Sequence, residues 1–300
     1  MSILVTGARG QLGRELCRQL GSAASGLDVD RLDLTQAPIV HRHLEQTRPE
    51  AVINCAAYTQ VDQAEREPEA CRAVNVEAVA TLADGCRRLG CPLVQISTDY
   101  VFGGGRGQRH EPYCENDPPA PLGVYAQSKA DGEQVAATVA EHLIVRSCGL
   151  YAHPADTAAR NFPATMFRLA AEGRPLRVVC DQRCTPSYVP EVAAAIIFLL
   201  GAARRGEGPW GIYHATNRGE TNWYEFARQL FLLDDLSVEL TPIGTTDYGA
   251  PAPRPAYSVL DTSKYHKLGG PPMSHWRESL ANYVTAWRGI HRAADHAHGG

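Results

Sequence analysis

Short apolar runs alternate with segments of helical spacing along the first half of the chain. The first apolar run is residues 3–5, and the apolar and charged positions that follow residue 13 recur at the spacing of a helix. Further apolar runs occupy residues 51–57, 92–98 and 143–151, with helical segments between them. Strands separated by helices of this length predict βαβ units and a parallel, doubly wound sheet of the α/β class. The ligand crevice of such a sheet lies at the carboxyl ends of its strands.

The alternation weakens after Tyr151, where proline and glycine become more frequent. The apolar segment VAAAIIFLL reads as a buried helix, and GIYHATN reads as a strand that returns to the sheet. We therefore predict a Rossmann-like dinucleotide-binding domain made of residues 1–150 plus about 187–217. A second, smaller substrate-binding lobe is predicted for about 151–186 plus 218–290, followed by a disordered tail at 291–300.

Three glycines, Gly7, Gly10 and Gly13, stand between the first strand and the first helix. Such a turn leaves the first N–H groups of the helix unpaired at the positive end of the helix dipole, where a phosphate binds well. Gly7 would permit the turn, Gly10 would let the backbone approach a pyrophosphate, and Gly13 would let the helix pack on the strand. The alternative is a turn with only a packing role, but the position directly after a strand favours dinucleotide binding.

Composition narrows the partners that need to be considered. A formal net charge of −4 gives no reason to expect nucleic acid or an anionic membrane as a partner. The first strand follows Met1 directly and no apolar run reaches membrane-spanning length, so neither a signal peptide nor a membrane span is expected. Nine scattered cysteines without paired metal-ligand spacing predict reduced thiols in a cytoplasmic protein.

Tyr125 and Lys129 are four residues apart in a segment of helical spacing, which places both side chains on one face of a helix. A tyrosine with a pKa near ~10 transfers protons more readily beside a cation that stabilises its phenolate. Lys129 can supply that charge and also reach a cofactor ribose, while the hydroxyl of Thr98 can bind the same substrate oxygen. Taken alone, the pair could also be a surface tyrosine packed on a lysine stem.

Together these features resemble the extended short-chain dehydrogenase/reductase superfamily, whose glycine signature T-G-x-x-G-x-x-G stands here at residues 6–13. More narrowly, the chain is similar to the dTDP-4-dehydrorhamnose reductase family over nearly all of residues 1–285. The segments that carry this resemblance are GQLG, LDLT, NCAAYTQVDQAEREPE, STDYVF, VYAQSKADGE, DQRCTPS and RPAYSVLDTSK. The resemblance implies the last reduction of dTDP-L-rhamnose synthesis, a supply route for cell-surface polysaccharide.

The resemblance also implies a role for each matching residue. It implies catalysis by Thr98, Tyr125 and Lys129, and sugar contacts from Thr98, Asp99 and Tyr100. The cofactor-binding residues that it implies are Gly7, Gly10, Gln11, Leu12, Gly13, Asp33, Leu34, Ala56, Ala57, Tyr58, Thr59, Tyr125 and Lys129. Taken singly, Asp33 could equally cap a helix and Ala57 could equally be a packing residue.

Two cofactor questions stay open at this point. Asp30-Arg31 lies where an acidic residue would bind a ribose 2′-hydroxyl and a basic residue a 2′-phosphate, so both NADH and NADPH are candidates. Some members of the family hold Mg²⁺ between subunits, and Glu15 and Glu191 match those ligands by position. The alternative for both glutamates is a solvated helix face, which we favour, so no metal is predicted.

Two positions depart from the family pattern. Members commonly carry a tryptophan against the sugar where this chain has Gly149, and a small residue where it has Cys184. Loss of an indole removes a flat apolar wall from the sugar site, which predicts a different sugar or a different pose.

The leading hypothesis is a reductase that transfers hydride from NADH or NADPH to the 4-keto carbon of a nucleotide-linked 6-deoxysugar. Tyr125 would protonate the alkoxide, Lys129 would lower the phenol pKa, and Thr98 would orient the carbonyl. A nucleotide-sugar epimerase or dehydratase is one alternative, although Tyr100 stands where a dehydratase needs a second carboxylate. A non-catalytic NADP-binding subunit, similar to the β subunit of methionine adenosyltransferase, is the other. A homodimer is also expected.

Overall fold

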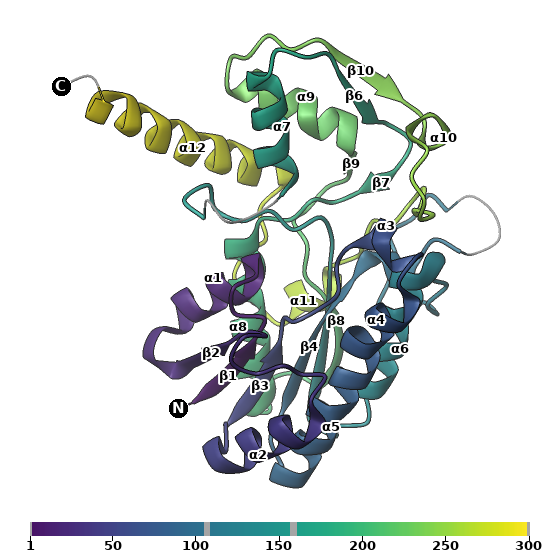
Figure 1. Cartoon of the computed structure of the whole chain (residues 1–300), viewed down its shortest axis with the longest axis vertical. Helices are drawn as coiled ribbons and strands as arrows, with labels where there is room; N and C mark the ends of the chain where they lie inside the picture. The colour runs from purple at the N-terminus through teal and green to yellow at the C-terminus, as the bar shows by residue number, and fades with distance from the viewer. Residues whose placement is uncertain (1, 105–108, 157–160, 299–300) are drawn as a thin grey trace.

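Six parallel strands form the central sheet of the computed structural model, which describes residues 2–104, 109–156 and 161–298 (Figure 1). Their spatial order is β2-β1-β3-β4-β5-β8. The strands are Ile3–Thr6 (β1), Ala24–Leu27 (β2), Ala51–Asn54 (β3), Leu93–Thr98 (β4), His142–Ser147 (β5) and Gly211–His214 (β8). Because the chain leaves β1 toward one edge and returns to the other side of it as β3, the two connections separate there and open a crevice.

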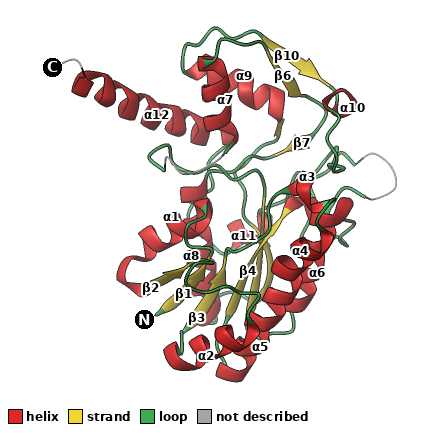
Figure 2. Ribbon diagram, viewed as in Figure 1, coloured by secondary structure: helices red, strands yellow, loops and turns green. Residues whose placement is uncertain are grey.

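Helices cover both faces of this sheet (Figures 1 and 2). Gln11–Leu20 (α1), Val189–Arg204 (α8) and Ser263–Lys267 (α11) pack on one face in one apolar core. Ala37–Thr47 (α2), Ala78–Leu89 (α5) and Gly123–Ala136 (α6) pack on the other. Strands β1, β3, β4 and β5 are short and almost fully buried between these layers, which explains why they read as continuous apolar runs.

Short helical pieces complete the connections between β1 and α6. Gly21–Ala23 (η1) and Asp99–Val101 (η3) are 3₁₀ turns, and Val61–Ala64 (α3) and Pro68–Arg72 (α4) follow β3. A π-helical segment, Ala73–Glu77 (η2), lies between α4 and α5. Such π segments are frequent at functional sites.

Buried polar side chains tie three neighbouring strands together near their carboxyl ends. The Thr6 hydroxyl donates a hydrogen bond of 2.6 Å to Asn54 Oδ1, and the Asn54 amide donates one of 2.8 Å to Gln95 Oε1. The Gln95 amide in turn donates to the carbonyl of Ile96 at 3.0 Å. Each side chain is at most 2% exposed, so these bonds hold the crevice edge of β1, β3 and β4 in fixed register.

A second lobe lies beyond the carboxyl ends of the sheet (Figure 1). It contains parallel strands Leu176–Val179 (β6) and Leu240–Ile243 (β10), and the antiparallel pair Arg183–Cys184 (β7) and Thr221–Asn222 (β9). Its helices are Phe162–Ala171 (α7), Trp223–Leu233 (α9), Thr245–Tyr248 (α10) and Trp276–His298 (α12). An aromatic core that includes Tyr151, Phe226, Trp276 and Tyr283 gives this lobe its own interior.

The structure confirms the Rossmann-like α/β class with a smaller second lobe, and VAAAIIFLL and GIYHATN supply parts of α8 and β8 as expected. Strand β2 was not anticipated, because ASGL has no apolar run. Helix α12 spans Trp276–His298, and the disordered tail expected from residue 291 stays a prediction. The exact bounds between the two lobes stay a prediction.

Candidate active site

Two cavities meet at the carboxyl ends of the strands. The larger, of about 910 Å³, runs past the glycine turn and the ends of β1 to β4. The smaller, of about 160 Å³, lies between the end of β4 and the second lobe. Thr98, Tyr125 and Gly149 line both cavities, so any group bound in one faces a group bound in the other across these residues.

The glycine turn has the structure that its spacing predicts. Gly7 has a φ of +64°, and a side chain there would place its Cβ 2.6 Å from the backbone nitrogen of Ala56. A Cβ at Gly13 would collide with the carbonyl oxygen of Gly7. Gly10 is the N-cap of α1 and makes no side-chain capping bond, and the first turn of α1 lines the larger cavity through Gln11, Leu12 and Gly13.

Most of the residues expected to bind the cofactor line the larger cavity. The expected residues found there are Gly7, Gly10, Gln11, Leu12, Gly13, Asp33, Leu34, Ala56, Ala57, Thr59, Tyr125 and Lys129. Tyr58 does not line it, because its hydroxyl donates to Glu67 at 2.7 Å. A volume of this size suits a dinucleotide rather than a small metabolite.

The acidic residue that lines the larger cavity beside β2 is not the one that the sequence suggested. Asp28, which directly follows β2, lines the larger cavity, whereas Asp30 and Arg31 do not. Asp28 Oδ2 accepts a hydrogen bond of 2.8 Å from the backbone N–H of Arg9, and the Arg9 guanidinium pairs with Asp30 at 2.6 Å. The acidic residue at the end of β2 is therefore Asp28, and the nearby cation in the cavity wall is Arg9.

Asn75, in the π-helical segment η2, links the cofactor side of the site to α6. Its side chain accepts a hydrogen bond from the Tyr58 N–H at 2.9 Å and donates to the Tyr58 carbonyl at 3.1 Å. It also donates to the hydroxyl of Ser128 at 2.9 Å. The loop after β3 is thereby fixed to the helix that carries Tyr125 and Lys129.

Tyr125 and Lys129 lie one turn apart on α6, as their spacing predicts. Lys129 is 5% exposed, and its ammonium donates to the carbonyl of Ile96 at 2.6 Å. Burial lowers the pKa of Lys129 to about 8, and the carboxylate of Glu133 opposes that shift. Glu133 is itself held by Arg146 at 2.7 Å and by the hydroxyl of Ser97 at 2.5 Å.

The pKa of the Tyr125 phenol is raised, whereas the sequence suggested a lowered one. Burial raises the pKa of Tyr125 well above its usual range, the charge of Asp99 raises it further, and a hydrogen bond with Thr98 opposes both. Lys129 was expected to lower this pKa, and the largest cause of the rise is loss of solvation of the phenolate. Tyr125 therefore holds its proton at neutral pH, which is the form that a proton donor requires.

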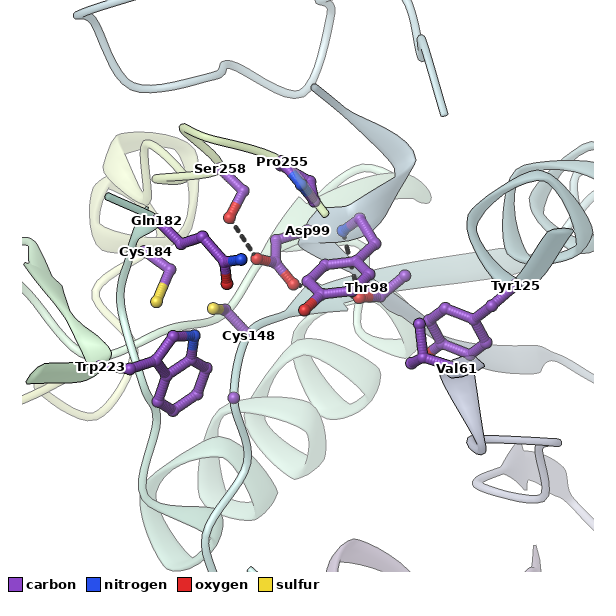
Figure 3. A pocket seen from close by; sticks show the side chains of 12 residues that line it. Val61, Thr98, Asp99, Tyr125, Cys148, Gln182, Cys184, Trp223, Pro255 and Ser258 are labelled. Carbon is purple, nitrogen blue, oxygen red and sulfur yellow. Dashed lines mark hydrogen bonds between the residues drawn. The ribbon is translucent and has the colours of Figure 1, made fainter. Parts of the chain in front are cut away.

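The smaller cavity joins the end of β4 to side chains of the second lobe (Figure 3). Asp99 is 1% exposed and accepts a hydrogen bond of 2.5 Å from the hydroxyl of Ser258. Burial raises the pKa of Asp99, against the effect of that hydrogen bond. A hydrogen bond with Cys184, together with burial, raises the pKa of the Cys148 thiol.

Several residues of the smaller cavity were not anticipated as site residues. They are Val61, Cys148, Gln182, Trp223, Pro255 and Ser258. Val61, Gln182, Pro255 and Ser258 stand inside the motifs VDQAE, DQRCTPS and RPAYSVLDTSK, which offered a signal, whereas nothing local marks Trp223. The substrate residues expected from the sequence, Thr98, Asp99 and Tyr100, all line this cavity.

The two glutamates considered as metal ligands are bound by side chains of this chain. Glu15 accepts hydrogen bonds from Arg18 at 2.6 and 2.7 Å. Glu191 accepts from the Asn217 amide at 2.8 Å and from the Ser279 hydroxyl at 2.6 Å. Among the described residues no group of three or more His, Cys, Asp or Glu side chains could hold a metal ion, so the structure gives no support for Mg²⁺.

Comparison with known proteins places these features in a family. Residues 1–288 match the family described as the RmlD substrate binding domain. The dTDP-4-dehydrorhamnose reductase of Streptomyces griseus is 41% identical over 289 residues, which cover 94% of this chain and 93% of the relative. The chain belongs to the dTDP-4-dehydrorhamnose reductase family.

Two further relatives of this dTDP-4-dehydrorhamnose reductase family member bear on the site. A dTDP-4-dehydrorhamnose reductase from Bacillus anthracis, solved in complex with NADP, is 35% identical with a TM-score of 0.88, covering 95% of this chain and 99% of that one. A Streptomyces antibioticus protein is 40% identical over 93% of each chain and is described as a probable dTDP-4,6-dihydroxy-2-methyloxan-3-one 4-ketoreductase. Across the described part of this family member, no helix has the length and apolar character of a bilayer span.

Proposed function

We propose that the protein reduces the 4-keto group of a dTDP-linked 6-deoxysugar, dTDP-4-dehydrorhamnose to dTDP-rhamnose, with NADPH or NADH as the reductant. The observation that carries this proposal is that Thr98 and Tyr125 line both the dinucleotide-sized cavity and the smaller one. The names of the relatives support the substrate, and the NADP complex of the Bacillus anthracis protein supports the cofactor class.

The chain's own residues explain how such a reduction proceeds. A bound nicotinamide cofactor supplies the hydride, and the glycine turn and first turn of α1, with the ribose-side residues, would hold it in the larger cavity. Tyr125 gives its phenolic proton to the oxygen of the substrate as negative charge develops there. The Thr98 hydroxyl donates its one proton to Asp99 at 3.0 Å in this structure, and it would turn that proton to the substrate oxygen in order to orient it. The Lys129 ammonium stabilises the phenolate left behind.

The alternatives fit the site less well. A dehydratase needs an acid-base carboxylate pair beside the threonine, and among the described residues lining the smaller cavity Asp99 is the single carboxylate. A purely binding role leaves unexplained why a protonated phenol, a buried ammonium and a threonine hydroxyl converge between two cavities. Another dTDP-linked ketosugar is the stronger rival, since the Streptomyces antibioticus relative carries such a description.

The test is oxidation of NADPH or NADH followed at the nicotinamide absorbance, with dTDP-4-dehydrorhamnose generated in situ. We expect stoichiometric oxidation of the cofactor and formation of dTDP-rhamnose. Cofactor that is bound but not consumed with this substrate, in folded protein, would exclude the assignment. If the cofactor were consumed only with a different dTDP-ketosugar, the protein would instead be assigned as the reductase of that sugar.

The activity is expected to have an alkaline limit set by Lys129. Because burial lowers the pKa of Lys129 to about 8, its ammonium loses a proton as the pH rises through that value. The kcat/KM is therefore level below about pH 8 and falls tenfold per pH unit above it. A profile of kcat/KM against pH measures this limit. A fall in kcat/KM that begins only above pH 10 would indicate titration of Tyr125 instead, since its pKa is raised.

Asp28 is expected to set the balance between the two cofactors. Its carboxylate suits a ribose 2′-hydroxyl and repels a 2′-phosphate, while Arg9 in the same wall attracts that phosphate. Asp28→Asn removes the charge, so the ratio of kcat/KM for NADPH to that for NADH should rise about tenfold. Asp235→Asn, whose side chain is 86% exposed in the second lobe, is the control. A ratio that stays constant in both variants would contradict the assignment.

Three further features of the proposal rest on the family resemblance. They are a homodimer, a cytoplasmic location and a role in cell-surface polysaccharide synthesis. A relative from Bacillus subtilis, 38% identical, is described as a spore coat polysaccharide biosynthesis protein, which supports the last of these.

A further inference from the structure

The smaller cavity contains an indole that comes from the second lobe. Trp223 is the first residue of α9 and lines this cavity together with Thr98 and Tyr125. Figure 3 shows Trp223 and Tyr125 on opposite sides of Asp99 and Cys148. The cavity therefore has a proton donor at one end and a flat apolar surface at the other.

The position of the indole depends on the absence of a side chain at Gly149. A Cβ built on Gly149 would lie 2.9 Å from Cη2 of Trp223 and 3.2 Å from Cα of Pro186. Gly149 also has a φ of +50°, which disfavours any other residue. The six-membered ring of Trp223 thus rests directly over the backbone at residue 149, in the space that a side chain there would occupy.

The indole is held firmly from behind. Its ring packs on Phe162 at a centroid distance of 4.8 Å and meets Phe226 edge to face at 6.4 Å. Asn222 caps the start of α9 by accepting a hydrogen bond of 2.8 Å from the Glu225 N–H. Strand β9, directly before Trp223, pairs with β7, which carries the cavity residue Cys184. Phe226 is fully buried whereas Trp223 is only partly buried, so its remaining surface faces the cavity.

We propose that Trp223 forms the wall against which the sugar ring of the substrate packs, so that the second lobe and not residue 149 supplies the aromatic surface. The proposal rests on the proposed function, because it assumes a nucleotide-linked sugar in the smaller cavity. The apolar C–H face of a pyranose lies against the indole, and this contact presents the opposite edge of the ring to Thr98 and Tyr125. Trp223 is then a determinant of sugar specificity, independent of the proton-transfer residues.

The experiment compares binding of dTDP-L-rhamnose with binding of dTDP alone, measured by calorimetry in the presence of NADP⁺. Trp223→Leu should weaken binding of dTDP-L-rhamnose about tenfold or more and change binding of dTDP less than twofold. Trp223→Phe retains an aromatic face and should lie between the leucine variant and the wild type. The ratio of the two dissociation constants isolates the sugar contact from any general weakening of the nucleotide site.

Trp287→Leu is the matched control for loosening of the second lobe. Trp287 stacks on Phe167 at 4.5 Å and is not among the residues that line the smaller cavity. It should lower the melting temperature without changing the ratio of the two dissociation constants. If the ratio of the dissociation constants for dTDP-L-rhamnose and dTDP were the same in Trp223→Leu as in the wild type, Trp223 would not be the sugar-packing wall. A wild type that neither binds dTDP-L-rhamnose nor reduces the ketosugar would instead overturn the proposed function, and the wall with it.

Discussion

Tyr125→Phe is expected to lower kcat by two or more orders of magnitude, about the contribution of a positioned proton donor. Phenylalanine keeps the ring in its half-buried place on α6, where it meets Tyr100 edge to face at 6.1 Å, and removes only the hydroxyl. Affinity for the cofactor should change little, because the larger cavity keeps the glycine turn and Lys129. Steady-state kinetics with the ketosugar, together with a fluorescence titration of NADPH, measure the two effects separately.

Tyr248→Phe is the matched control, since that tyrosine is 53% exposed on α10. It should leave kcat unchanged. If Tyr125→Phe retained more than about a tenth of the wild-type kcat with its cofactor affinity intact, another group would have to donate the proton. Thr98 would be the next candidate, because it lines both cavities.

The second large effect is expected from Gly13→Ala. A methyl group at residue 13 would collide with the carbonyl oxygen of Gly7 and lie 2.9 Å from Cα of Ala8. Backbone atoms cannot move aside as a flexible side chain can, so α1 must shift away from β1. We expect a loss of stability of about 1–3 kcal/mol, as for other overpacked sites, and loss of measurable NADPH binding. Thermal denaturation and a binding titration test this result.

Gly10→Ala separates the effect of this turn on stability from its effect on NADPH binding. Its Cβ would meet only the Gly7 carbonyl, at 3.2 Å, so the melting temperature should stay close to that of the wild type while NADPH affinity falls. Gly289→Ala, in α12, has no heavy atom within 4 Å of the added Cβ and should change neither property by much. If Gly13→Ala bound NADPH like the wild type, the turn would not be a phosphate site.

The parts of the site that the sequence revealed are those set by near neighbours. Gly7, Gly10 and Gly13 act within one turn of chain, and Tyr125 and Lys129 meet because a helix repeats at that spacing. The resemblance to the family extended these local signals to the loop after β3 and to Asp33. Each of these predictions concerns backbone geometry that survives changes elsewhere in the molecule.

Other parts depend on packing that no local pattern encodes. The acidic residue on the ribose side was expected at Asp30, whereas Asp28 directly follows β2 and lines the larger cavity; β2 itself was not anticipated, because ASGL is short and has no apolar run. Tyr58 turns away from the cofactor cavity because Glu67 accepts its hydroxyl hydrogen, a contact set by the fold of α4. Trp223 reaches the site only because α9 begins beside a glycine 74 positions earlier in the chain.

The division of the smaller cavity between two lobes has a consequence for how such enzymes diversify. Thr98 and Tyr125 belong to β4 and α6 of the sheet domain, whereas Gln182, Cys184 and Trp223 belong to the second lobe. A substitution in the second lobe reshapes the space for the sugar without touching the donors of hydride and proton. Single substitutions in the second lobe can therefore change the sugar specificity during evolution while the catalytic residues stay the same.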